Sequence, residues 1–157
     1  MTPEIVFQGG TEADRQRVLE LQQAYLDANA TFDWVALDKI WSHDATNVFF
    51  NMNGHTYVGL AHWTALWKYY RERIETGLWE PYDIKVMING NVAVVTCHRR
   101  TRRRWKGPAS ERPPEHADKS FISRSTMVMT RDHEHGDWKT VHVHFSEASP
   151  GARPGDI

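Results

Sequence analysis

The chain has a single cysteine, Cys97, among its 157 residues. An internal disulfide requires a second cysteine and a cysteine-rich zinc site requires several, so both are excluded. The sequence also lacks a glycine-rich phosphate loop, a dinucleotide-binding fingerprint and a nucleophilic serine motif. Chemistry that depends on a nucleotide or a nicotinamide is therefore not expected.

An excess of charge of either sign is absent as well. Lysine and arginine together number 19, aspartate and glutamate 20, and the formal net charge is −1. Whole-chain electrostatics therefore gives no reason to expect nucleic acid or an anionic membrane as a partner. No stretch has the length of a membrane span, and residues 1–10 lack the basic start and apolar run of a leader. We expect a cytoplasmic protein.

Aromatic side chains, in contrast, are abundant. The chain has seven tryptophans, five tyrosines and six phenylalanines. So many rings suit a deep pocket for a flat or aromatic ligand, although an ordinary core or a dimer interface is the more common explanation.

Three helices are predicted in the first half of the chain. Thr11 and Asp14 have the spacing of a capping box before an apolar stripe over 11–30. Asp33 is suited to cap a shorter second helix. A third helix is predicted over 60–76, because its aromatic residues recur on one side with charged residues on the other.

The period changes to two in the second half, which predicts strands. A short hairpin is expected within 46–58, where an Asn-Gly pair favours a tight turn. Longer strands follow over 82–88, 92–105, 119–131 and within 136–148. Helices followed by an antiparallel meander indicate an α+β fold with the helices on one concave face of the sheet. We expect one domain over 1–157, with tails at 1–10 and 150–157.

Two histidines, His142 and His144, lie one residue apart in the last predicted strand, GDWKTVHVHFSEA. Alternate strand residues share a face, so the two imidazoles lie side by side. They could bind a metal with a third ligand, although no motif supplies one, and we expect no metal site. They could instead act as acid–base groups in a cavity, or lie on the opposite face if Val141 and Val143 face the core. The last two alternatives stay open.

Five arginines occur between His98 and Trp105. Of Arg99 and Arg100, one must point inward because successive strand residues alternate. We expect residues 102–104 to lie in solvent. For Arg124, in the middle of the next predicted strand, it is again open whether the side chain points inward. A buried arginine without a partner is costly, so two inward arginines would form a receptor for a carboxylate or phenolate.

Tyr25 lies on the apolar side of the first predicted helix. It is suited to the core, and equally to donating a hydrogen bond to a developing oxyanion in a pocket. Asp44 could serve as a base, but an aspartate at this place more commonly satisfies local backbone groups.

Between Thr11 and Ser149 the sequence resembles the SnoaL-like, or nuclear transport factor 2-like, superfamily. The resemblance rests on Asp33-Trp34 after the first helix, on HDAT at 43–46, and above all on the ending GDWKTVHVHFS. That ending is similar to the branch containing the association domain of calcium/calmodulin-dependent kinase II. The resemblance implies a curved antiparallel sheet wrapped against three helices, a cone with an internal cavity, and dimers through the open face of the sheet.

The resemblance also implies roles for individual residues. Tyr25 stands eight residues before Asp33, as the oxyanion-hole tyrosine of ketosteroid isomerases stands before the matching aspartate. The isomerase base falls on Phe49, which cannot take a proton, so steroid isomerase activity is not expected. Arg99 matches the arginine that lines the association domain's pocket, which favours Arg99 over Arg100 as the inward residue.

The same resemblance implies which residues of two strands face the cavity. It implies that Asn47, Phe49 and Asn51 share the cavity-facing side. A gapless comparison with the isomerase directs Val141 and Val143, rather than the histidines, into the cavity.

We therefore expect a cofactor-independent lyase that acts by elimination, dehydration or retro-aldol chemistry on a small aromatic or polycyclic substrate. The alternative is a non-catalytic ligand-binding and oligomerisation module. The expected partners are a small aromatic or carboxylate ligand and a second copy of the chain, and no metal or organic cofactor. The candidate catalytic residues are Tyr25, Arg99, His142 and His144, and the candidate substrate-binding residues are Asn47, Phe49, Trp63, Trp67 and Arg124.

Overall fold

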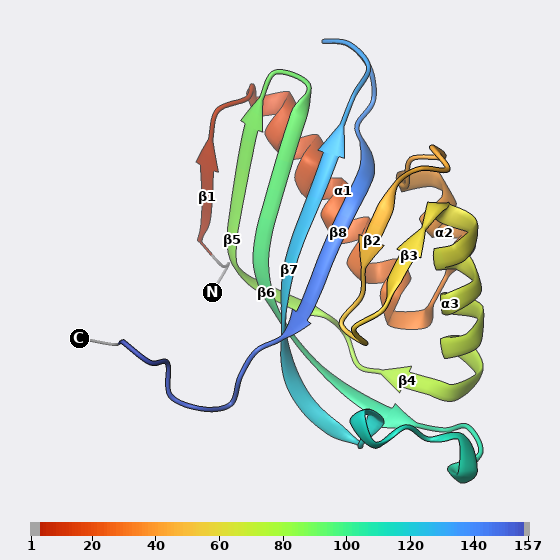
Figure 1. Ribbon diagram of the computed structural model, residues 1–157. Coiled ribbons are helices and arrows are strands. Elements are labelled where there is room, and N and C mark those ends of the chain that lie inside the picture. The colour runs from red at the N-terminus through yellow and green to blue at the C-terminus, as the bar shows by residue number, and fades with distance from the viewer. Residues whose placement is uncertain (1–3, 156–157) are drawn as a thin grey trace.

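The computed structural model describes residues 4–155, which form a curved sheet of eight strands and three α-helices (Figure 1). The helices are α1 (Glu12–Thr31), α2 (Trp34–Ile40) and α3 (Gly59–Arg73). The strands are β1 (Ile5–Gln8), β2 (Val48–Phe50), β3 (Thr56–Val58), β4 (Ile74–Thr76), β5 (Glu80–Asn89), β6 (Val92–Trp105), β7 (Lys119–Thr130) and β8 (Lys139–Glu147). None of the described helices is both long enough and apolar enough to cross a membrane.

The first two helices begin at the predicted caps. Thr11 Oγ1 accepts a hydrogen bond from the Asp14 N–H at 3.1 Å, and the Asp14 carboxylate accepts one from the Thr11 N–H, which completes the capping box. Asp33 Oδ1 accepts hydrogen bonds from the N–H groups of Val35 and Ala36 at the start of α2. These caps satisfy helix N–H groups that have no partner within the helix.

The third helix is shorter than predicted. It ends at Arg73, and Ile74–Thr76 form β4, which pairs antiparallel with the end of β6. Ile74 is buried there. Two of the three residues are β-branched, and pairing with β6 satisfies the backbone groups of an otherwise unpaired strand end, so tertiary context overrides the helical pattern.

The sheet is mixed rather than wholly antiparallel. Its strands follow the order β1-β5-β6-β7-β8-β2-β3 across the described part of the chain, with β4 beside the far end of β6. Strands β5 to β8 form the predicted antiparallel meander, whereas β1 is parallel to β5 and β2 is parallel to β8. The predicted tail at 1–10 is therefore partly wrong, because the β-prone Ile5–Gln8 segment covers the edge of β5. Residues 150–155 contain no helix or strand, and 156–157 lie outside the described residues.

Helix α1 lies behind β5 to β8 in Figure 1, and α2 and α3 lie beside β2 and β3. Strands β6 and β7 bend at one end toward a connecting loop that carries two short 3₁₀ helices, η1 (Ala109–Glu111) and η2 (Pro114–His116). The predicted cone fold with helices on its concave side is confirmed. The apolar core fills much of the space between sheet and helices.

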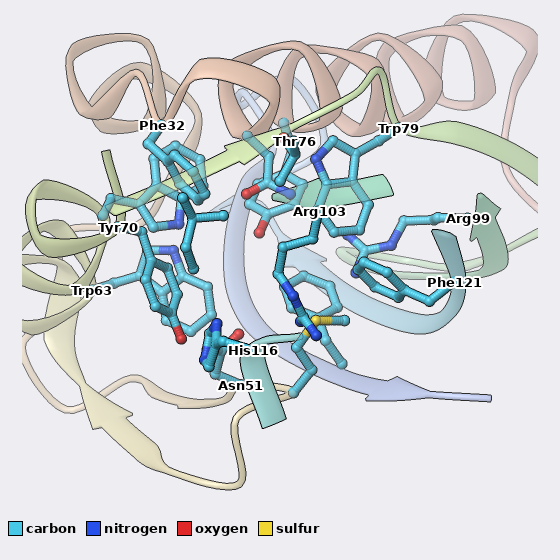
Figure 2. Close-up of a pocket in the computed structure, with 16 residues that line it drawn as sticks. Phe32, Asn51, Trp63, Tyr70, Thr76, Trp79, Arg99, Arg103, His116 and Phe121 are labelled. Atoms are coloured by element: carbon cyan, nitrogen blue, oxygen red, sulfur yellow. The ribbon is translucent and has the colours of Figure 1, made fainter. Parts of the chain in front are cut away.

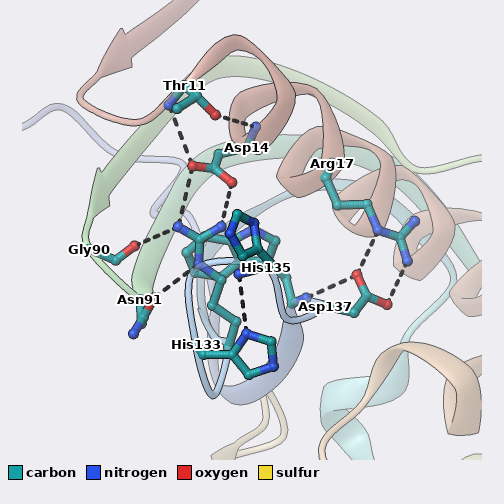
Figure 3. A network of polar contacts seen from close by, with 10 residues as sticks. Thr11, Asp14, Arg17, Gly90, Asn91, His133, His135 and Asp137 are labelled. Atoms are coloured by element: carbon teal, nitrogen blue, oxygen red, sulfur yellow. Dashed lines mark hydrogen bonds and ion pairs between the residues drawn. The ribbon is translucent and has the colours of Figure 1, made fainter.

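A polar network ties the start of α1 to the turns at one end of the sheet (Figure 3). Arg131 Nη1 lies 2.6 Å from Asp14 Oδ1, and Arg17 Nε lies 3.0 Å from Asp137 Oδ1. Arg131 also donates to Asn91 Oδ1 at 3.1 Å. These contacts join residues of α1 to residues more than 100 positions later in the chain, and they fix the position of the helix on the sheet.

Candidate functional site

A pocket opens between the concave face of the sheet and helices α1 and α3 (Figure 2). Its free volume is about 50 Å³. The wall is largely aromatic, and its aromatic carbocyclic and indole rings belong to Tyr25, Phe32, Trp63, Trp67, Tyr70, Trp79, Phe121 and Phe145. Among the described residues that line it there is no aspartate or glutamate.

Four of the nine candidate site residues meet in this pocket: Tyr25, Trp63, Trp67 and Arg99. Tyr25 projects from α1, the two tryptophans from α3 and Arg99 from β6. Asn51, expected to share the cavity-facing side, also lines it. Residues from three separate elements therefore converge as the sequence patterns predict.

Arg99 is the most deeply buried charged residue of the pocket, with 1% of its surface exposed. Its guanidinium carbon lies 4.1 Å from the centre of the Phe145 ring and 4.7 Å from that of Trp79. Nη2 donates to Ser123 Oγ at 2.6 Å, whereas Nε and Nη1 have no partner in the described protein. Burial lowers the pKa of Arg99, but a guanidinium stays protonated at neutral pH.

Arg103 also points into the pocket, contrary to the prediction that residues 102–104 lie in solvent. The inward alternation that includes Arg99 continues through Thr101 to Arg103, and the loop segment at η2 covers it. Arg103 Nη2 donates to the backbone carbonyl of Glu115 at 2.7 Å, and Nε has no partner in the described protein. No carboxylate forms an ion pair with Arg99 or Arg103 within residues 4–155, so both cations are available to a ligand.

Tyr25 stays protonated at neutral pH and can donate a hydrogen bond. It is 1% exposed and its ring packs 5.5 Å from the ring of Phe145 and 5.8 Å from that of Trp67. Burial raises the pKa of its hydroxyl, and the nearby Arg99 opposes this effect without cancelling it.

The pocket concentrates hydrogen-bond donors without partners. Of the buried side-chain atoms that have no partner among the described residues, the pocket contributes nitrogens of six residues. One is the ring nitrogen His116 Nδ1, and the other five residues contribute donor groups: Asn51 Nδ2, Trp63 Nε1, Trp79 Nε1, Arg99 Nε and Nη1, and Arg103 Nε. Each of these groups can only donate. Buried donors without acceptors are costly, so a ligand rich in acceptor oxygens fits this wall.

His116 is the one imidazole that lines the pocket among the described residues. It is 8% exposed, its ring lies 5.7 Å from that of Tyr70 and 5.8 Å from that of Trp105, and Nδ1 has no partner. Burial and the charge of Arg103 lower its pKa, so it is neutral at pH 7. The sequence prediction missed it because a histidine in a Pro-rich loop has no periodic pattern to mark it.

The structure decides the question left open for His142 and His144. Val143 and Phe145 are buried toward the core, so the two histidines lie on the outer face of the sheet. His142 Nδ1 lies 2.5 Å from the Val48 carbonyl oxygen, and His144 is exposed. Neither lines the pocket, so their expected place in the cavity is wrong. No cluster of three or more candidate metal ligands occurs in residues 4–155.

Three further candidates lie away from the pocket. Arg124 is on the outer face, where Nε donates to Ser146 Oγ at 3.0 Å. Phe49 is fully buried behind the pocket wall, with its ring 5.7 Å from that of Trp63. Asn47 precedes β2 and its carbonyl accepts from the Gly59 N–H. Asn47, Phe49 and Asn51 were expected to share the cavity-facing side. Tryptophans of the core cover β2 on this side, so of the three only Asn51, which follows β2, lines the pocket.

The sequence matches the SnoaL-like domain family over residues 18–150. No curated protein matches it. Among solved structures it is similar to a nuclear transport factor 2 (NTF2-like) superfamily protein from Salmonella enterica, with a TM-score of 0.70 and 17% identity over 94% of this chain and 100% of that one. It is similar also to a proposed dehydratase of the NTF2-like family from Streptomyces avermitilis, with a TM-score of 0.69 and 16% identity over 88% and 98%.

A third similar structure is the CaMKII hub from S. rosetta. The TM-score is 0.61 and the identity 25%, over 85% of this chain and 95% of the hub. Together these structures confirm the fold predicted from the resemblance.

Proposed function

This chain belongs to the SnoaL-like domain family, and we propose that it is a cofactor-independent lyase that acts by proton transfer on a small aromatic anion. The observation that carries the proposal is the pair of buried arginines, Arg99 and Arg103, inside an aromatic pocket that no carboxylate lines among the described residues. A carboxylate or phenolate supplies both the negative charge and the acceptor oxygens that this wall lacks.

The two arginines approach a ligand carboxylate from two sides. They are four residues apart on one strand, which separates their Cα atoms by roughly 13 Å. Arg103 binds the ligand carboxylate from the side of the covering loop, and Arg99 with Tyr25 binds it from deeper inside, where the two donors also stabilise negative charge that develops on its oxygen during the reaction. Trp63 and Trp67 hold the ring of the substrate between them and the sheet.

Such a site lowers the barrier for enolate-like intermediates. Donors fixed in a dry pocket need no reorganisation when charge develops, and the low polarity around them strengthens each hydrogen bond. Elimination and retro-aldol reactions both pass through such an intermediate, and neither requires a cofactor.

Benzoate binding tests the anion site directly. Titration calorimetry should detect benzoate, while benzamide, its neutral relative of similar shape, should bind at least tenfold more weakly. Arg99→Gln should abolish the preference for benzoate, and Arg102→Gln, an exposed arginine on the same strand, should preserve it. Equal affinity for benzoate and benzamide would contradict the proposal.

Turnover is tested with 3-hydroxy-3-arylpropanoates, which combine an aromatic ring, a carboxylate and a leaving group. From the phenyl compound, elimination yields cinnamate and water, and a retro-aldol reaction yields benzaldehyde and acetate, so one substrate distinguishes the two reaction types. Product formation that depends on Arg99 and Tyr25 supports the lyase.

The similarity to the CaMKII hub supports a second candidate, a non-catalytic module that binds a carboxylate and assembles with other copies. Benzoate binding without turnover across the panel, together with ring-like assemblies in light scattering, would favour this module over the lyase.

We also propose a homodimer through the outer face of the sheet. Phe50 on β2 is 39% exposed there, and its ring lies 5.2 Å from that of His142 and 5.3 Å from that of His144. Light scattering should give twice the chain mass, and Phe50→Asp should shift the protein toward the monomer. An unchanged mass for this variant would contradict the proposed interface.

A further inference from the structure

We propose that His116 is the group that exchanges a proton with the ligand, carried into the pocket by the segment 106–118, an inference that rests on the proposed function. His116 is the only buried side chain of this segment, which the structure describes throughout. The other side chains of the segment are exposed or partly exposed. The segment therefore contributes a single titratable ring to the pocket.

Ring contacts, and no hydrogen bond within the described residues, position the imidazole of His116. Tyr70 on α3 and Trp105 at the end of β6 contact its ring, and Nδ1 has no partner among the described residues. A histidine that only filled the core would be expected to satisfy this nitrogen. His116 as a residue is 8% exposed, and its buried, unpartnered Nδ1 is free to accept a proton from a molecule in the pocket.

The volume of the pocket requires one wall to move when a ring binds. The free space is about 50 Å³, whereas a cavity that holds benzene has a volume of about 150 Å³. All side chains of the segment 106–118 except His116 are exposed or partly exposed, and the Arg103 hydrogen bond to the Glu115 carbonyl holds the segment beside His116. A ligand carboxylate that binds Arg103 takes the place of that carbonyl and releases the segment to adjust around the ligand.

The proposed step is a simple elimination. His116 Nδ1 takes the proton from the carbon beside the ligand carbonyl or carboxylate carbon, and the C–H electron pair forms an enolate whose oxygen receives the negative charge near Arg99 and Tyr25. The enolate then forms the new carbon–carbon double bond as the leaving group departs with its bonding pair. The imidazolium returns the proton to the leaving group, so atoms and charge balance without a co-reactant.

The charges around His116 determine its pH behaviour. Arg103 from β6 faces it and disfavours the imidazolium, Glu115 from the same segment favours it, and Tyr70 from α3 faces it as a neutral phenol. A bound carboxylate offsets the charge of Arg103 and therefore raises the pKa of His116 toward that of an ordinary histidine. By linkage, benzoate binding takes up a proton, and benzoate affinity rises as the pH falls toward the His116 pKa.

The test is benzoate calorimetry in two buffers of different ionisation enthalpy, over roughly pH 5 to 8. The wild type should take up a fraction of a proton on binding. His116→Gln should still bind benzoate within about threefold of the wild type but take up none, while His55→Gln, an exposed histidine on the β2–β3 hairpin, should behave as the wild type. On 3-hydroxy-3-phenylpropanoate, His116→Gln should lower kcat by about 100-fold with little change in KM.

The outcomes separate this inference from the proposed function. If the wild type fails to bind benzoate, both are wrong. If benzoate binds with the same proton uptake in His116→Gln, or with none in the wild type, the role of His116 is wrong and the anion site stands. Should His116→Gln not fold, NMR titration of the nine wild-type histidines decides, because one must show a lowered pKa that benzoate raises.

Discussion

Two arginines whose side chains have little exposed surface have opposite surroundings in this protein. Arg131, at the end of the sheet beside α1, is 9% exposed at its side chain and every nitrogen of its guanidinium has an acceptor, supplied by Asp14, Asn91 and Gly90 (Figure 3). Arg99, which lies in the middle of the same sheet and lines the pocket (Figure 2), donates to the Ser123 hydroxyl and has the neutral Tyr25 hydroxyl nearby, but no carboxylate pairs with it among the described residues. The sheet buries both cations, but it neutralises only one of them.

The difference separates a structural arginine from one that we propose as part of a receptor. A buried cation without a counter-ion lowers stability, so the surroundings of Arg99 work against the fold. Aromatic faces on two sides compensate in part through cation–π contacts. The two deficient positions, Arg99 and Arg103, both lie in one pocket, which is where an anionic ligand would restore the missing interactions.

The largest expected effect comes from Arg99→Gln. This change should weaken benzoate binding by roughly 30- to 100-fold, because charged hydrogen bonds contribute about 2–3 kcal/mol. It should leave the free energy of unfolding unchanged or raise it, because an unpaired charge is removed from the interior. Calorimetry and urea unfolding measure the two quantities. A loss of stability as large as the loss of affinity would contradict the contrast with Arg131.

Arg131→Gln should have the reverse profile. The free energy of unfolding should fall by about 2 kcal/mol, less than for a fully buried pair because both partners keep some exposure. Benzoate affinity should stay within twofold of the wild type. Arg17→Gln is the matched control, because its pair with Asp137 is largely exposed, and it should cost less than about 1 kcal/mol. Equal losses of unfolding free energy in the two variants would show that the lower exposure of the Arg131–Asp14 pair does not increase its contribution to stability.

Acid should weaken the Arg131 region through Asp14. Burial alone would raise the pKa of Asp14, but hydrogen bonds from Thr11 and Arg131 outweigh it and hold the pKa below its usual value. A lowered folded-state pKa contributes stability that is fully present above about pH 4, the unfolded value, and is lost as the pH falls through the folded value. Urea midpoints measured against pH should show this loss in the wild type. Asp14→Asn should lack that part of it, and an identical acid dependence in both proteins would contradict the assignment.

Tyr25→Phe should produce the smallest change. It removes one neutral donor beside Arg99, so benzoate affinity should fall about three- to tenfold. The ring contacts with Trp41, Trp67 and Phe145 remain. The free energy of unfolding should therefore change by no more than about 1 kcal/mol. An unchanged benzoate affinity would exclude Tyr25 from the anion site.

Local patterns predicted much of the fold. The caps at Thr11 and Asp33 and the hairpin turns at Gly54 and Gly90, both with positive φ, are where the sequence places them. These features depend on neighbours in the chain, so short segments suffice to predict them. The end of α3 was not predictable in this way, because Ile74–Thr76 become a strand only when β6 lies beside them.

The site was predicted less completely. Tyr25, Trp63, Trp67 and Arg99 are in the pocket, because helical and strand periods determine which residues share a side. Arg103 was predicted to lie in solvent, although it follows the same alternation as Arg99 and extending that pattern along the strand would have placed it inward. His116 had no such signal.

The sequence by itself determined which residues act together: Arg99 with Arg103 on one side of β6, His142 with His144 on one side of β8. Only the tertiary structure decided which side faces the pocket, because both sides of β6 carry arginines and the packing of the core against the helices selects one of them. The same packing brought His116 from a distant loop to the place where sequence reasoning had looked for His142 and His144. A contact between residues far apart in the chain depends on the path of the backbone between them, and no local pattern encodes it.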